Sequence, residues 1–492
     1  MRSAAAGSTR TPVRNVPQGV AVLGLGASGD AAARLALEKY GSVYVSDHSD
    51  DGGTRRRARA LEALGADVHL GGHDLGRIAG AGVVVTSPGI PGNAPVLRRL
   101  RARGVRWISE PEFAARFRTG ALIGVTGTNG KTTTSVLIGH LLVAAGIDAA
   151  VGGNVGGGIA PPASALALRS PRAEWWVLEL SSFQLAGIER FSPEIGVLTN
   201  LSEDHLDRYG EVTRYFADKK RLFRNATAAS RWVVNGEDAE ALALAGDAVG
   251  ELHLFAGKPR DAEPLPARAR LSAFVRDGVL TLRTGAARGP DASDEPLVPR
   301  EKLRLLGRHN VMNALAAALA ARLAGAAPAS LRRGLASFAP LPHRLEPVTE
   351  RSGVLWVNDS KATNVTATLS ALASIARPVV LILGGKDKGE DPLPLVPALE
   401  SAAARAVVLY GETAGRWARE LSGPLSDGAG SGGDRIPVVV AAGLDDAVAV
   451  ARRHALPGDA LLLSPACPSF DLFRSYEERG ARFAGLARER AR

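Results

Sequence analysis

A glycine-rich segment near residue 130 has the residue types of a phosphate-binding loop. An apolar run at 121–125 leads into the sequence Gly124-Val-Thr-Gly-Thr-Asn-Gly-Lys-Thr132. The glycines would let backbone N–H groups approach phosphate oxygens, Lys131 could neutralise phosphate charge, and the Thr132 hydroxyl could bind Mg²⁺. The spacing is one residue longer than in the common G-x4-GK[ST] loop, although Gly127 supplies a further loop glycine. A chance glycine turn is the weaker interpretation, because the preceding strand and the Lys-Thr pair agree.

A second glycine motif lies near the start of the chain. Gly24, Gly26 and Gly29 have the spacing of a dinucleotide-binding turn, and Asp47 ends the next apolar run, where it could contact a ribose. This motif alone is poor evidence for NAD, because backbone amides at a helix N-terminus hold any nucleotide diphosphate. The glycines could also serve only tight strand–helix packing. From the residues alone, both interpretations remain open.

Polar clusters follow three apolar runs in the middle of the chain, at 152–156, 179–184 and 200–208. The carboxyl ends of parallel strands face the ligand crevice of an α/β sheet, so Glu179 and His205 could hold a second Mg²⁺ near a terminal phosphate. Taken singly, Glu179 would more often be a helix-capping acid and His205 a surface histidine.

Two adjacent lysines, Lys219 and Lys220, lie on a helix predicted at 215–223. Lysines on helices are usually solvated. The pattern alone gives no reason to prefer one of them for a functional role.

Three polar segments in the last third of the chain, at 358–364, 383–388 and 464–471, also follow apolar runs. In an α/β sheet they would lie where the crevice opens. Lys388 with hydroxyl donors nearby would suit an anionic substrate such as an amino acid with a side-chain carboxylate. Asp359 and Ser469 could instead be ordinary helix N-caps.

Hydrophobic patterning predicts the elements that position these residues. A chain of 492 residues is too long for one compact core, and strand-length apolar runs alternate with helical stretches, which predicts parallel sheets. The fold class is α/β with three domains: a Rossmann-like N-terminal domain over 1–118, a central P-loop ATPase-type domain over 119–340 and a Rossmann-like C-terminal domain over 341–492. The stretch 247–299 predicts a small antiparallel excursion, and the Gly/Ser-rich stretch 423–434 predicts a flexible loop.

Composition narrows the class of protein. The net charge is +10, but the two denser basic clusters, at 55–57 and 98–103, lack interleaved aromatics and a nucleic-acid motif, so we expect solvated helix faces and no nucleic-acid partner. The single cysteine, Cys467, excludes a disulfide framework. Because no signal-peptide pattern and no uncharged run of eighteen apolar residues occur, we expect a cytoplasmic protein that does not contact a membrane.

Taken together, these segments resemble the Mur ligases, within the wider family that includes folylpolyglutamate synthetases. The ATP loop at 126–132 is shared across that family. Five further segments resemble its D-glutamate-adding branch, and they lie at 179–185, 203–208, 341–344, 358–364 and 464–469. The resemblance covers about 18–490. Phe470 and Tyr476 stand where members of the family often have Leu and Phe, and both keep an apolar wall.

The resemblance implies a role for each matching residue. The residues implied to bind ATP are Gly127, Thr128, Asn129, Gly130, Lys131, Thr132, Thr133, Asn310, Asn313, Arg344 and Asp359. Those implied to contact the UDP-linked substrate are Ser28, Asp47, Ser87, Asn154 and His205. Those implied to form a D-glutamate pocket are Lys361, Thr363, Lys388, Ser469 and Tyr476. The implied catalytic set is Lys131, Glu179, His205 and Lys219.

The implied metal site holds two Mg²⁺ ions, with ligands from Thr132, Glu179, His205 and Lys219. The last of these would be carbamylated by CO₂, which converts a cation into a carboxylate-like ligand. The choice of Lys219 over Lys220 rests on the family register counted from Tyr215.

The activity implied is ATP-dependent addition of D-glutamate to UDP-N-acetylmuramoyl-L-alanine through an acyl phosphate, in peptidoglycan precursor synthesis, by a monomer whose third domain closes like a lid. Three rival hypotheses remain. An NAD(P)-dependent oxidoreductase would leave the loop at Lys131 idle, and the intact catalytic set argues against a non-catalytic nucleotide-binding scaffold. The segment 359–364 argues against a sister ligase that adds another amino acid.

Overall fold

The computed structural model describes residues 19–156, 158–204, 206–259, 269–284, 293–427 and 435–489. The chain divides into two compact units, which we describe separately. The first comprises residues 1–139, 146–234 and 238–252, and the second comprises 140–145, 235–237 and 253–492. His205 lies outside the described residues, and so does the part of the predicted loop at 428–434.

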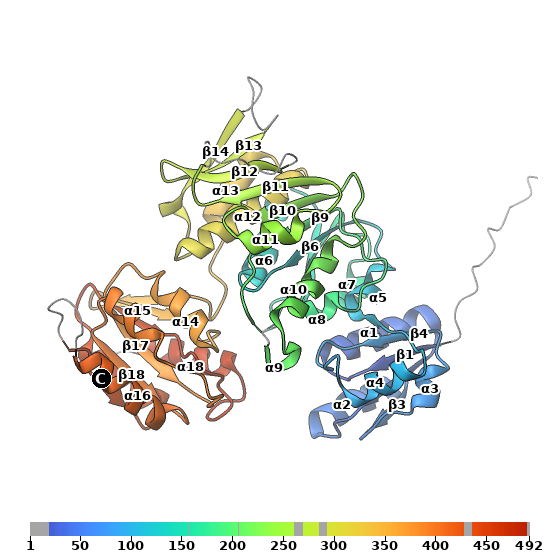
Figure 1. The fold of residues 1–492 in the computed structure, drawn as a ribbon, viewed down its shortest axis with the longest axis horizontal. Helices are drawn as coiled ribbons and strands as arrows, with labels where there is room; N and C mark the ends of the chain where they lie inside the picture. Colours follow the sequence, from blue (N-terminus) through green and yellow to red (C-terminus); the bar gives the residue numbers. More distant parts are fainter. Residues whose placement is uncertain are drawn as a thin grey trace, which may run out of the picture. The chain divides into compact units, whose positions relative to one another are not determined.

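The N-terminal part of the first unit is a doubly wound sheet (Figure 1). Its elements are β1 (Val20–Leu23), α1 (Ala27–Tyr40), β2 (Val43–Asp47), α2 (Gly52–Glu62), β3 (Asp67–Leu70), α3 (Leu75–Ala79), β4 (Val83–Thr86), α4 (Pro95–Ala102), β5 (Ile108–Ser109) and α5 (Glu110–Ala115). The strands are parallel in the order β3-β2-β1-β4-β5. The chain reverses direction across the sheet between β1 and β4, which is where ligand crevices open in such sheets.

A second parallel sheet forms the rest of the first unit. Its elements are β6 (Ala121–Thr126), α6 (Lys131–Ala144), β7 (Ala149–Gly153), α7 (Ala163–Arg169), β8 (Trp175–Glu179), α8 (Ser182–Leu185), β9 (Ile195–Leu198), α9 (Leu206–Tyr209), α10 (Val212–Lys220), a 3₁₀ turn (Arg221–Phe223), β10 (Arg231–Asn235) and α11 (Ala239–Ala245). The strand order is β10-β9-β6-β8-β7, and each neighbouring pair is parallel. The strand that leads into the phosphate loop, β6, therefore lies at the centre, and its inner residues are buried.

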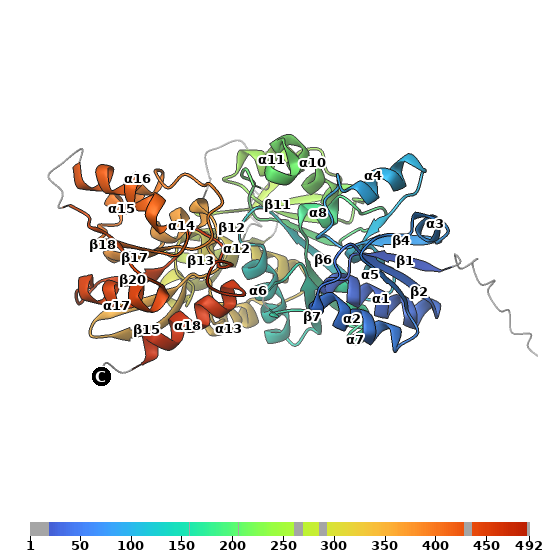
Figure 2. The same ribbon diagram turned by 90° about the horizontal axis from the view of Figure 1, so that it is seen from below.

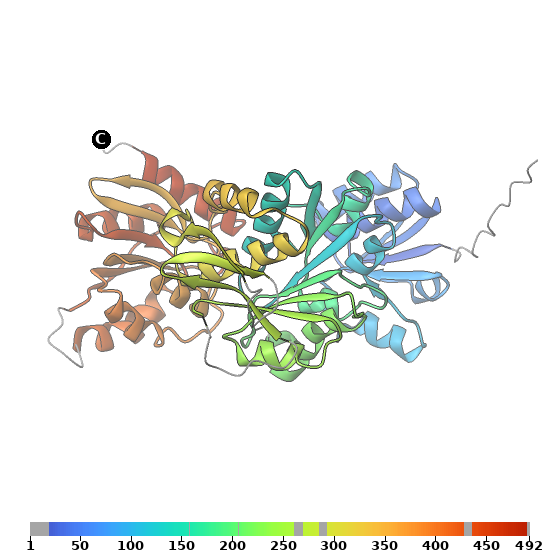
Figure 3. The same cartoon turned by 90° about the horizontal axis from the view of Figure 1, so that it is seen from above.

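The second unit begins with an antiparallel layer, as the sequence predicts. Its elements are β11 (Glu251–Ala256), β12 (Ala269–Arg276), β13 (Val279–Thr284), β14 (Ser293–Pro299), a 3₁₀ turn (Arg300–Lys302), α12 (Arg308–Leu323) and α13 (Pro328–Ser337). The strand order is β14-β13-β12-β11, and both pairings of β13 are antiparallel. Figure 3 shows these yellow strands beside the gold helices α12 and α13.

The C-terminal part of the second unit is another doubly wound sheet. Its elements are β15 (Glu346–Arg351), β16 (Val354–Asn358), α14 (Val365–Leu372), β17 (Val379–Gly384), α15 (Leu395–Ser401), β18 (Ala406–Tyr410), α16 (Ala414–Asp427), β19 (Val438–Val440), α17 (Leu444–His454), β20 (Ala460–Leu463) and α18 (Tyr476–Arg488). The strand order is β15-β16-β20-β17-β18-β19, parallel except for β15.

Apolar side chains that alternate between the two faces of this last sheet form two hydrophobic cores, one on each face. Leu381 and Leu383 on β17 belong to a cluster with side chains of α14, α15 and α16, whereas Val380 and Ile382 belong to a cluster with α17 and α18. Successive side chains of a strand point to opposite faces, so an all-apolar strand needs helices on both sides. Figure 2 shows these two groups of helices on opposite faces of the sheet.

The α/β fold class with three domains is confirmed, and the sheets form where the apolar runs predict strands. One local expectation is wrong: residues 423–427, predicted as loop, continue α16 through Pro424. Leu421 and Leu425 of this turn are buried in the core, and that burial offsets the hydrogen bond that proline removes. No helix among the described residues is long and apolar enough to cross a bilayer.

Candidate active site

The phosphate loop is a tight turn between β6 and α6. Gly127 has φ +146°, and a Cβ atom there would lie 2.0 Å from Thr199 Oγ1, so this position accepts no side chain. Thr128 N–H donates to Asn200 O at 2.9 Å, and Asn129 N–H donates to Asn200 Oδ1 at 2.9 Å. The segment that follows β9 therefore holds the loop in one conformation.

Two lysines converge on this loop. Lys131 Nζ donates to Gly127 O at 3.0 Å and to Thr128 O at 2.7 Å, and Lys219 Nζ donates to Gly127 O at 2.6 Å. Lys219 is buried against the Tyr215 ring, with its Nζ 4.5 Å from the ring centroid. Burial, followed by the positive charge of Lys131, lowers the pKa of Lys219 well below its ordinary value, although Asp204 and Glu179 oppose this shift.

The neighbouring lysine has a different environment. Lys220 is about half exposed, and its Nζ lies 3.8 Å from Asp247. The two lysines are one residue apart on α10, a rotation of about 100°, so only one of them can face the loop. The structure thus distinguishes two residues that the sequence pattern does not, in favour of Lys219.

Glu179 ends β8, the strand beside β6, and its carboxylate is buried. Asn154 Nδ2 donates to Glu179 Oε1 at 3.2 Å, whereas Glu179 Oε2 has no hydrogen-bond partner among the described residues. The alternative role as a helix cap is wrong, because Ser181 caps α8 and forms a reciprocal capping box with Gln184. A buried carboxylate oxygen without a donor is suited to a cation.

The donor set fits Mg²⁺ only in part. Glu179 supplies a buried carboxylate, and Thr132 places a buried hydroxyl in the first turn of α6. Among the described residues, no cluster of three or more His, Cys, Asp or Glu side chains could hold a metal ion. Glu179 and Thr132 alone are therefore too few protein ligands for a complete Mg²⁺ site within the described part of the chain, and His205 lies outside that part.

A pocket of about 460 Å³ opens at the carboxyl ends of β1 and β2 in the N-terminal sheet. Gly24 and Asp47, both predicted from the glycine motif, line it. Asp47 Oδ2 accepts the N–H of Leu25 at 2.5 Å, and Oδ1 accepts the N–H of Ser49 at 2.7 Å. Asp47 thereby ties the end of β2 to the glycine turn and fixes the shape of the pocket floor.

The three motif glycines have different roles. A Cβ atom at Gly29 would lie 1.8 Å from Gly24 O, so this glycine is required for packing of α1 on β1. Nothing lies within 4 Å of a Cβ position at Gly26, so packing does not explain that glycine. Ser87 Oγ donates to Gly24 O at 3.0 Å behind the turn, and Ser28 lies half-buried in the first turn of α1.

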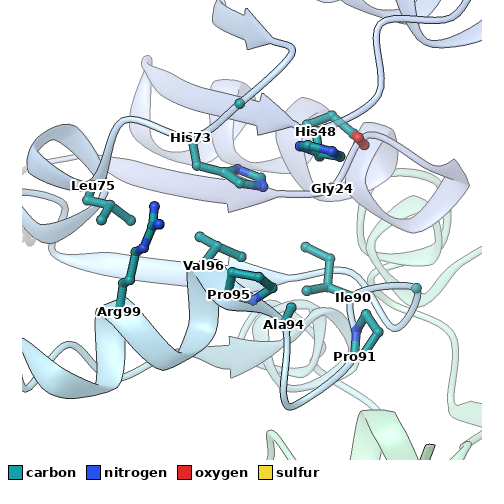
Figure 4. A pocket seen from close by; sticks show the side chains of 13 residues that line it. Gly24, His48, His73, Leu75, Ile90, Pro91, Ala94, Pro95, Val96 and Arg99 are labelled. Atoms are coloured by element: carbon teal, nitrogen blue, oxygen red, sulfur yellow. The ribbon is translucent and has the colours of Figure 1, made fainter.

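Other side chains of the pocket were missed by sequence reasoning. His48, His73 and Arg99 line it, and Figure 4 shows His73 facing the α4 wall from which Arg99 rises. His73 Nδ1 lies 2.8 Å from Ser46 Oγ, and burial lowers the pKa of His73. His48 directly follows Asp47 at a strand end, which could have flagged it. No pattern links His73 with Arg99, because they come from separate elements.

In the C-terminal sheet, the predicted D-glutamate residues lie at or after strand ends. Lys361 Nζ lies 4.0 Å from the centroid of the Tyr476 ring, a cation–π contact. Ser469 is buried, and its Oγ has no hydrogen-bond partner within the described ranges. Thr363 is half-buried and Lys388 is exposed. Sequence reasoning missed the buried Arg479.

Arg479 joins three of these strand-end segments. Its guanidinium donates to Ser360 Oγ at 3.0 Å, to Ser360 O and Cys467 O at 2.9 Å, and to Gly384 O at 3.4 Å. A guanidinium this deeply buried needs several acceptors, and here three backbone carbonyls and the Ser360 hydroxyl supply them. In sequence, Arg479 is one arginine among many on a helix.

The predicted adenine-side and closing residues also lie in the second unit. Asn313 Nδ2 donates to Asn310 Oδ1 at 3.1 Å within α12, and both are buried. Asp359 accepts from Ser464 Oγ at 2.8 Å and from Leu345 N at 3.1 Å, and burial raises its pKa to about 7. The capping alternatives for Asp359 and Ser469 are wrong, because the caps of α14 and α18 are residues 364 and 475. Arg344 precedes β15.

Comparisons with known proteins agree along the whole chain. Residues 18–109 match the Mur ligase MurD-like N-terminal domain, 125–321 match the Mur ligase middle domain, and 343–467 match the Mur ligase glutamate ligase domain. A UDP-N-acetylmuramoylalanine--D-glutamate ligase from Anaeromyxobacter dehalogenans is 43% identical over 488 residues, covering 96% of this chain and 98% of the relative. A ligase of the same name from Desulfatibacillum aliphaticivorans is 40% identical, covering 94% and 96%.

Solved structures show the same fold at lower identity. A pseudomurein peptide ligase type C from Methanothermus fervidus has a TM-score of 0.56 at 19% identity, covering 96% of this chain and 100% of that one. The UDP-N-acetylmuramate-alanine ligase MurC from Thermotoga maritima has a TM-score of 0.55 at 19% identity, covering 95% and 98%. With three successive domain models matched and relatives at 40% identity or more covered almost end to end, the chain belongs to the Mur ligase family.

Proposed function

We propose that this chain is an ATP-dependent ligase that adds D-glutamate to UDP-N-acetylmuramoyl-L-alanine in the synthesis of peptidoglycan precursors. The observation that carries the proposal is the meeting of Lys131 and Lys219 on the carbonyl of Gly127, with the buried carboxylate of Glu179 at the end of the adjacent strand. The relatives with this printed activity, which align over nearly the whole chain, support the same conclusion.

The phosphate loop would bind the triphosphate of ATP. Lys131 is within reach of the loop carbonyls and would turn toward the β- and γ-phosphates when they bind. The muramoyl substrate's carboxylate attacks the γ-phosphorus, the bond to ADP breaks, and an acyl phosphate forms. The amine of D-glutamate then attacks the acyl carbon, an amide bond forms, phosphate leaves, and one proton of the amine is released to solvent.

Lys219 would act as a carbamate. A neutral lysine amine can attack CO₂, forming an N–C bond and releasing one proton, so that the cationic side chain becomes an anion. The lowered pKa of Lys219 provides the neutral amine, because burial and Lys131 both disfavour its charged form. The carbamate would carry a negative charge, which would replace the repulsion between Lys219 and Lys131 by attraction.

The residues proposed to hold two Mg²⁺ ions are Thr132, Glu179, His205 and carbamylated Lys219. Mur ligases use ATP and Mg²⁺, and bound Mg²⁺ screens the charge on the transferred phosphoryl group. Asn154, hydrogen-bonded to Glu179, would orient that carboxylate and lie near the muramoyl group.

The N-terminal pocket would hold the uridine diphosphate. Amides at the start of α1 can approach a diphosphate past Gly26, and Asp47 has remaining lone pairs for a ribose hydroxyl. His48, His73 and Arg99 give this pocket two imidazoles and one cation, which suits an anionic ligand with a polar base. Ser28 and Ser87 flank the same turn.

The C-terminal domain would supply the amino-acid site and close over ATP. Lys361, Lys388 and the buried Ser469 hydroxyl provide cations and a donor for a dicarboxylate, and Thr363 and Tyr476 complete the proposed pocket. Asn310, Asn313, Arg344 and Asp359 are proposed ATP contacts. A monomeric state and a cytoplasmic location are parts of the same proposal, and the single buried thiol, Cys467, is compatible with a reducing compartment.

The test is phosphate release with ATP, Mg²⁺ and UDP-N-acetylmuramoyl-L-alanine, with D-glutamate, L-glutamate, L-alanine and meso-diaminopimelate offered separately. Release that requires D-glutamate is the expected result. Release with a different amino acid would retain ligase chemistry and refute the D-glutamate pocket. No release with any amino acid would favour the nucleotide-binding scaffold or the oxidoreductase.

A further inference from the structure

Two buried carboxylates join the N-terminal sheet to the phosphate-loop sheet within the first unit. Glu110 and Glu112 lie on α5, the last helix of the N-terminal part, and both are only 1% exposed. Neither belongs to the nucleotide pocket or to the phosphate loop. Burying a carboxylate is unfavourable unless hydrogen bonds compensate, so the partners of these two side chains show what they do.

Glu112 binds one short turn of the phosphate-loop domain. Its Oε2 accepts three consecutive backbone N–H groups, from Glu189 at 3.0 Å, Arg190 at 3.0 Å and Phe191 at 2.8 Å. Its Oε1 lies 3.6 Å from Arg116 on the same helix. These three N–H groups point at the same carboxylate oxygen and form a small concave site, so the Glu112 carboxylate fits there in only one position.

Glu110 binds a different segment of the same domain. Its Oε1 accepts the N–H of Ser164 at the start of α7, while its Oε2 has no partner among the described residues. Burial raises the pKa of Glu110 to about 7, even though the amides of Ala163 and Ser164 lower it. The helices α1, α5 and α7 lie side by side (Figure 2), so this contact is at the centre of the junction.

The two held segments are the two ends of one stretch of chain. From Ala163, the chain runs through α7 and β8 to Glu179, turns through α8, and returns to the turn at 189–191. Glu110 holds the start of this stretch and Glu112 holds its end, with Glu179 between them. The acidic pair therefore holds the segment before β8 and the segment after it, and β8 carries the candidate metal-binding carboxylate.

The aromatic side chains beside Glu112 do not cross this junction. Phe113 stacks with Tyr40 of α1 at a ring-centroid distance of 6.2 Å and meets Phe117 edge-on at 5.4 Å, so these rings fix α5 within the N-terminal part. The hydrogen bonds from fixed amides to the two carboxylates, by contrast, cross to the phosphate-loop domain and set both distance and direction.

We propose that Glu110 and Glu112 are positioning residues for the ligation reaction. They hold the nucleotide pocket at one distance and angle from Glu179 and the phosphate loop, so that a substrate bound at its uridine end presents its distal carboxylate to the loop. This inference rests on the proposed function, because it assumes one substrate that spans both sites. A misplacement of about 1 Å far from the chemistry can reduce turnover roughly 100-fold.

The experiment compares Glu112→Ala, Glu112→Asp and Glu112→Gln with the full-length wild-type protein. Each is assayed for phosphate release, for UDP affinity by calorimetry, and for protection of the 189–191 amides by hydrogen–deuterium exchange. The aspartate variant keeps the charge but withdraws the carboxylate by about 1.5 Å, one C–C bond. The glutamine variant keeps an acceptor oxygen at the original distance.

We expect the alanine and aspartate variants to keep their affinity for UDP, which is only one end of the substrate, but to lose kcat/KM for the whole muramoyl substrate. Glu112→Ala and Glu112→Asp should lower kcat/KM for the muramoyl substrate roughly 10- to 100-fold and lose amide protection, with UDP affinity within about twofold of wild type. Glu112→Gln should recover most of the turnover. Arg106→Ala is the matched control, because its exposed ion pair with Glu189 joins the same segments, and it should change turnover less than about threefold.

Three outcomes would overturn the positioning role. One is full kcat/KM in Glu112→Ala, and another is parallel loss of turnover and UDP affinity, which would indicate a general stability role. If Glu112→Ala does not fold, equal turnover in the aspartate and glutamine variants would refute the distance argument. A wild-type protein that releases no phosphate would refute the proposed function itself, whereas variant-specific failure leaves it intact.

Discussion

Two glycine turns in the first unit are built alike and surrounded differently. Both connect a central parallel strand to a helix, β1 to α1 and β6 to α6, and both need glycine where another backbone or side chain comes close. The turn after β6 is crossed by two lysine side chains and is bonded to the segment after β9. The turn after β1 meets a carboxylate, Asp47, and opens into a pocket.

This difference suggests which of the two turns would take part in phosphoryl transfer and which would only bind phosphate groups. Backbone amides at a helix N-terminus can hold phosphate groups in either place, because that interaction needs no side chain. Transfer of a phosphoryl group needs cations and metal ligands that respond to charge developing in the transition state. Lys131, Lys219 and Glu179 surround only the second turn. The turn after β1 would therefore bind the diphosphate of the substrate, and the turn after β6 would hold the phosphate groups that react.

The largest expected effect comes from Lys219. Replacing it by alanine removes the proposed carbamate and should lower kcat by roughly 10³-fold or more, the upper range for loss of one transition-state contact, without changing UDP affinity. Phosphate release and calorimetry measure the two quantities. Lys220→Ala, which alters the exposed neighbour on the same helix, should leave kcat within about twofold. Comparable losses in both variants would contradict the assignment.

Replacing Lys131 should lower kcat by the next largest factor, smaller than the factor for Lys219. Lys131→Ala leaves the backbone donors of the loop in place and should lower kcat roughly 10²- to 10³-fold in the same assay. The control is Lys39→Ala on α1, where an exposed ion pair with Glu38 is lost and activity should be retained. If Lys131→Ala kept wild-type kcat and raised only KM for ATP, the turn after β6 would only bind phosphate groups, as is proposed for the turn after β1. That result would contradict a role of Lys131 in phosphoryl transfer.

Asp47 should affect binding alone. In Asp47→Asn, the amide NH₂ would face one of the two backbone N–H groups that the carboxylate accepts, from Leu25 and Ser49. Asp47 is half-buried, so loss of this acceptor costs about 1 kcal/mol, at the lower end of the range for buried groups, and KM for the muramoyl substrate should rise roughly tenfold at unchanged kcat. Initial rates over a range of substrate concentrations separate the two constants. A drop in kcat at unchanged KM would show that the first turn also takes part in the reaction.

The smallest effect concerns the junction that joins the two turns. Burial raises the pKa of Glu110 from 4.5 to about 7, so between these values the folded chain binds more protons than the unfolded chain at this residue. Its contribution to the free energy of unfolding is therefore greatest below pH 4.5 and decreases as the pH rises to 7, by about 1.4 kcal/mol per pKa unit.

Glu110→Gln removes this titration while keeping an oxygen for the Ser164 N–H. Its melting temperature at pH 8 should exceed that of wild type by several degrees, because the stability lost between these pKa values amounts to a few kcal/mol and about 1 kcal/mol shifts the melting temperature of a large domain by roughly 2–4 °C. At pH 5 the two melting temperatures should differ less. Thermal unfolding by circular dichroism across this range measures both, and a wild-type advantage that grows with pH would show that the charged carboxylate stabilises the junction.

Local patterns explain why so much of the fold could be predicted. The apolar runs at β6, β17 and β20 are continuous because strands of a parallel sheet are covered on both faces, and glycines mark the turns that follow. The loop residues from Gly127 to Thr133 are contiguous in sequence, so their proximity follows from the motif itself. The end of α16 was mispredicted because tertiary burial of Leu425 outweighs the local composition.

The sequence by itself determined the fold class, the order of the sheets and the two glycine turns, because periodicity and turn chemistry act over a few neighbouring residues. Only the tertiary structure decided that Lys219 and not Lys220 faces Gly127. The sequence of a helix does not show which of two adjacent side chains points inward until one face of the helix is packed against the rest of the protein. Packing of separate elements likewise placed His73 and Arg99 around one pocket and buried Glu112 against the amides of 189–191. These contacts join residues far apart in the chain, and no local pattern encodes them.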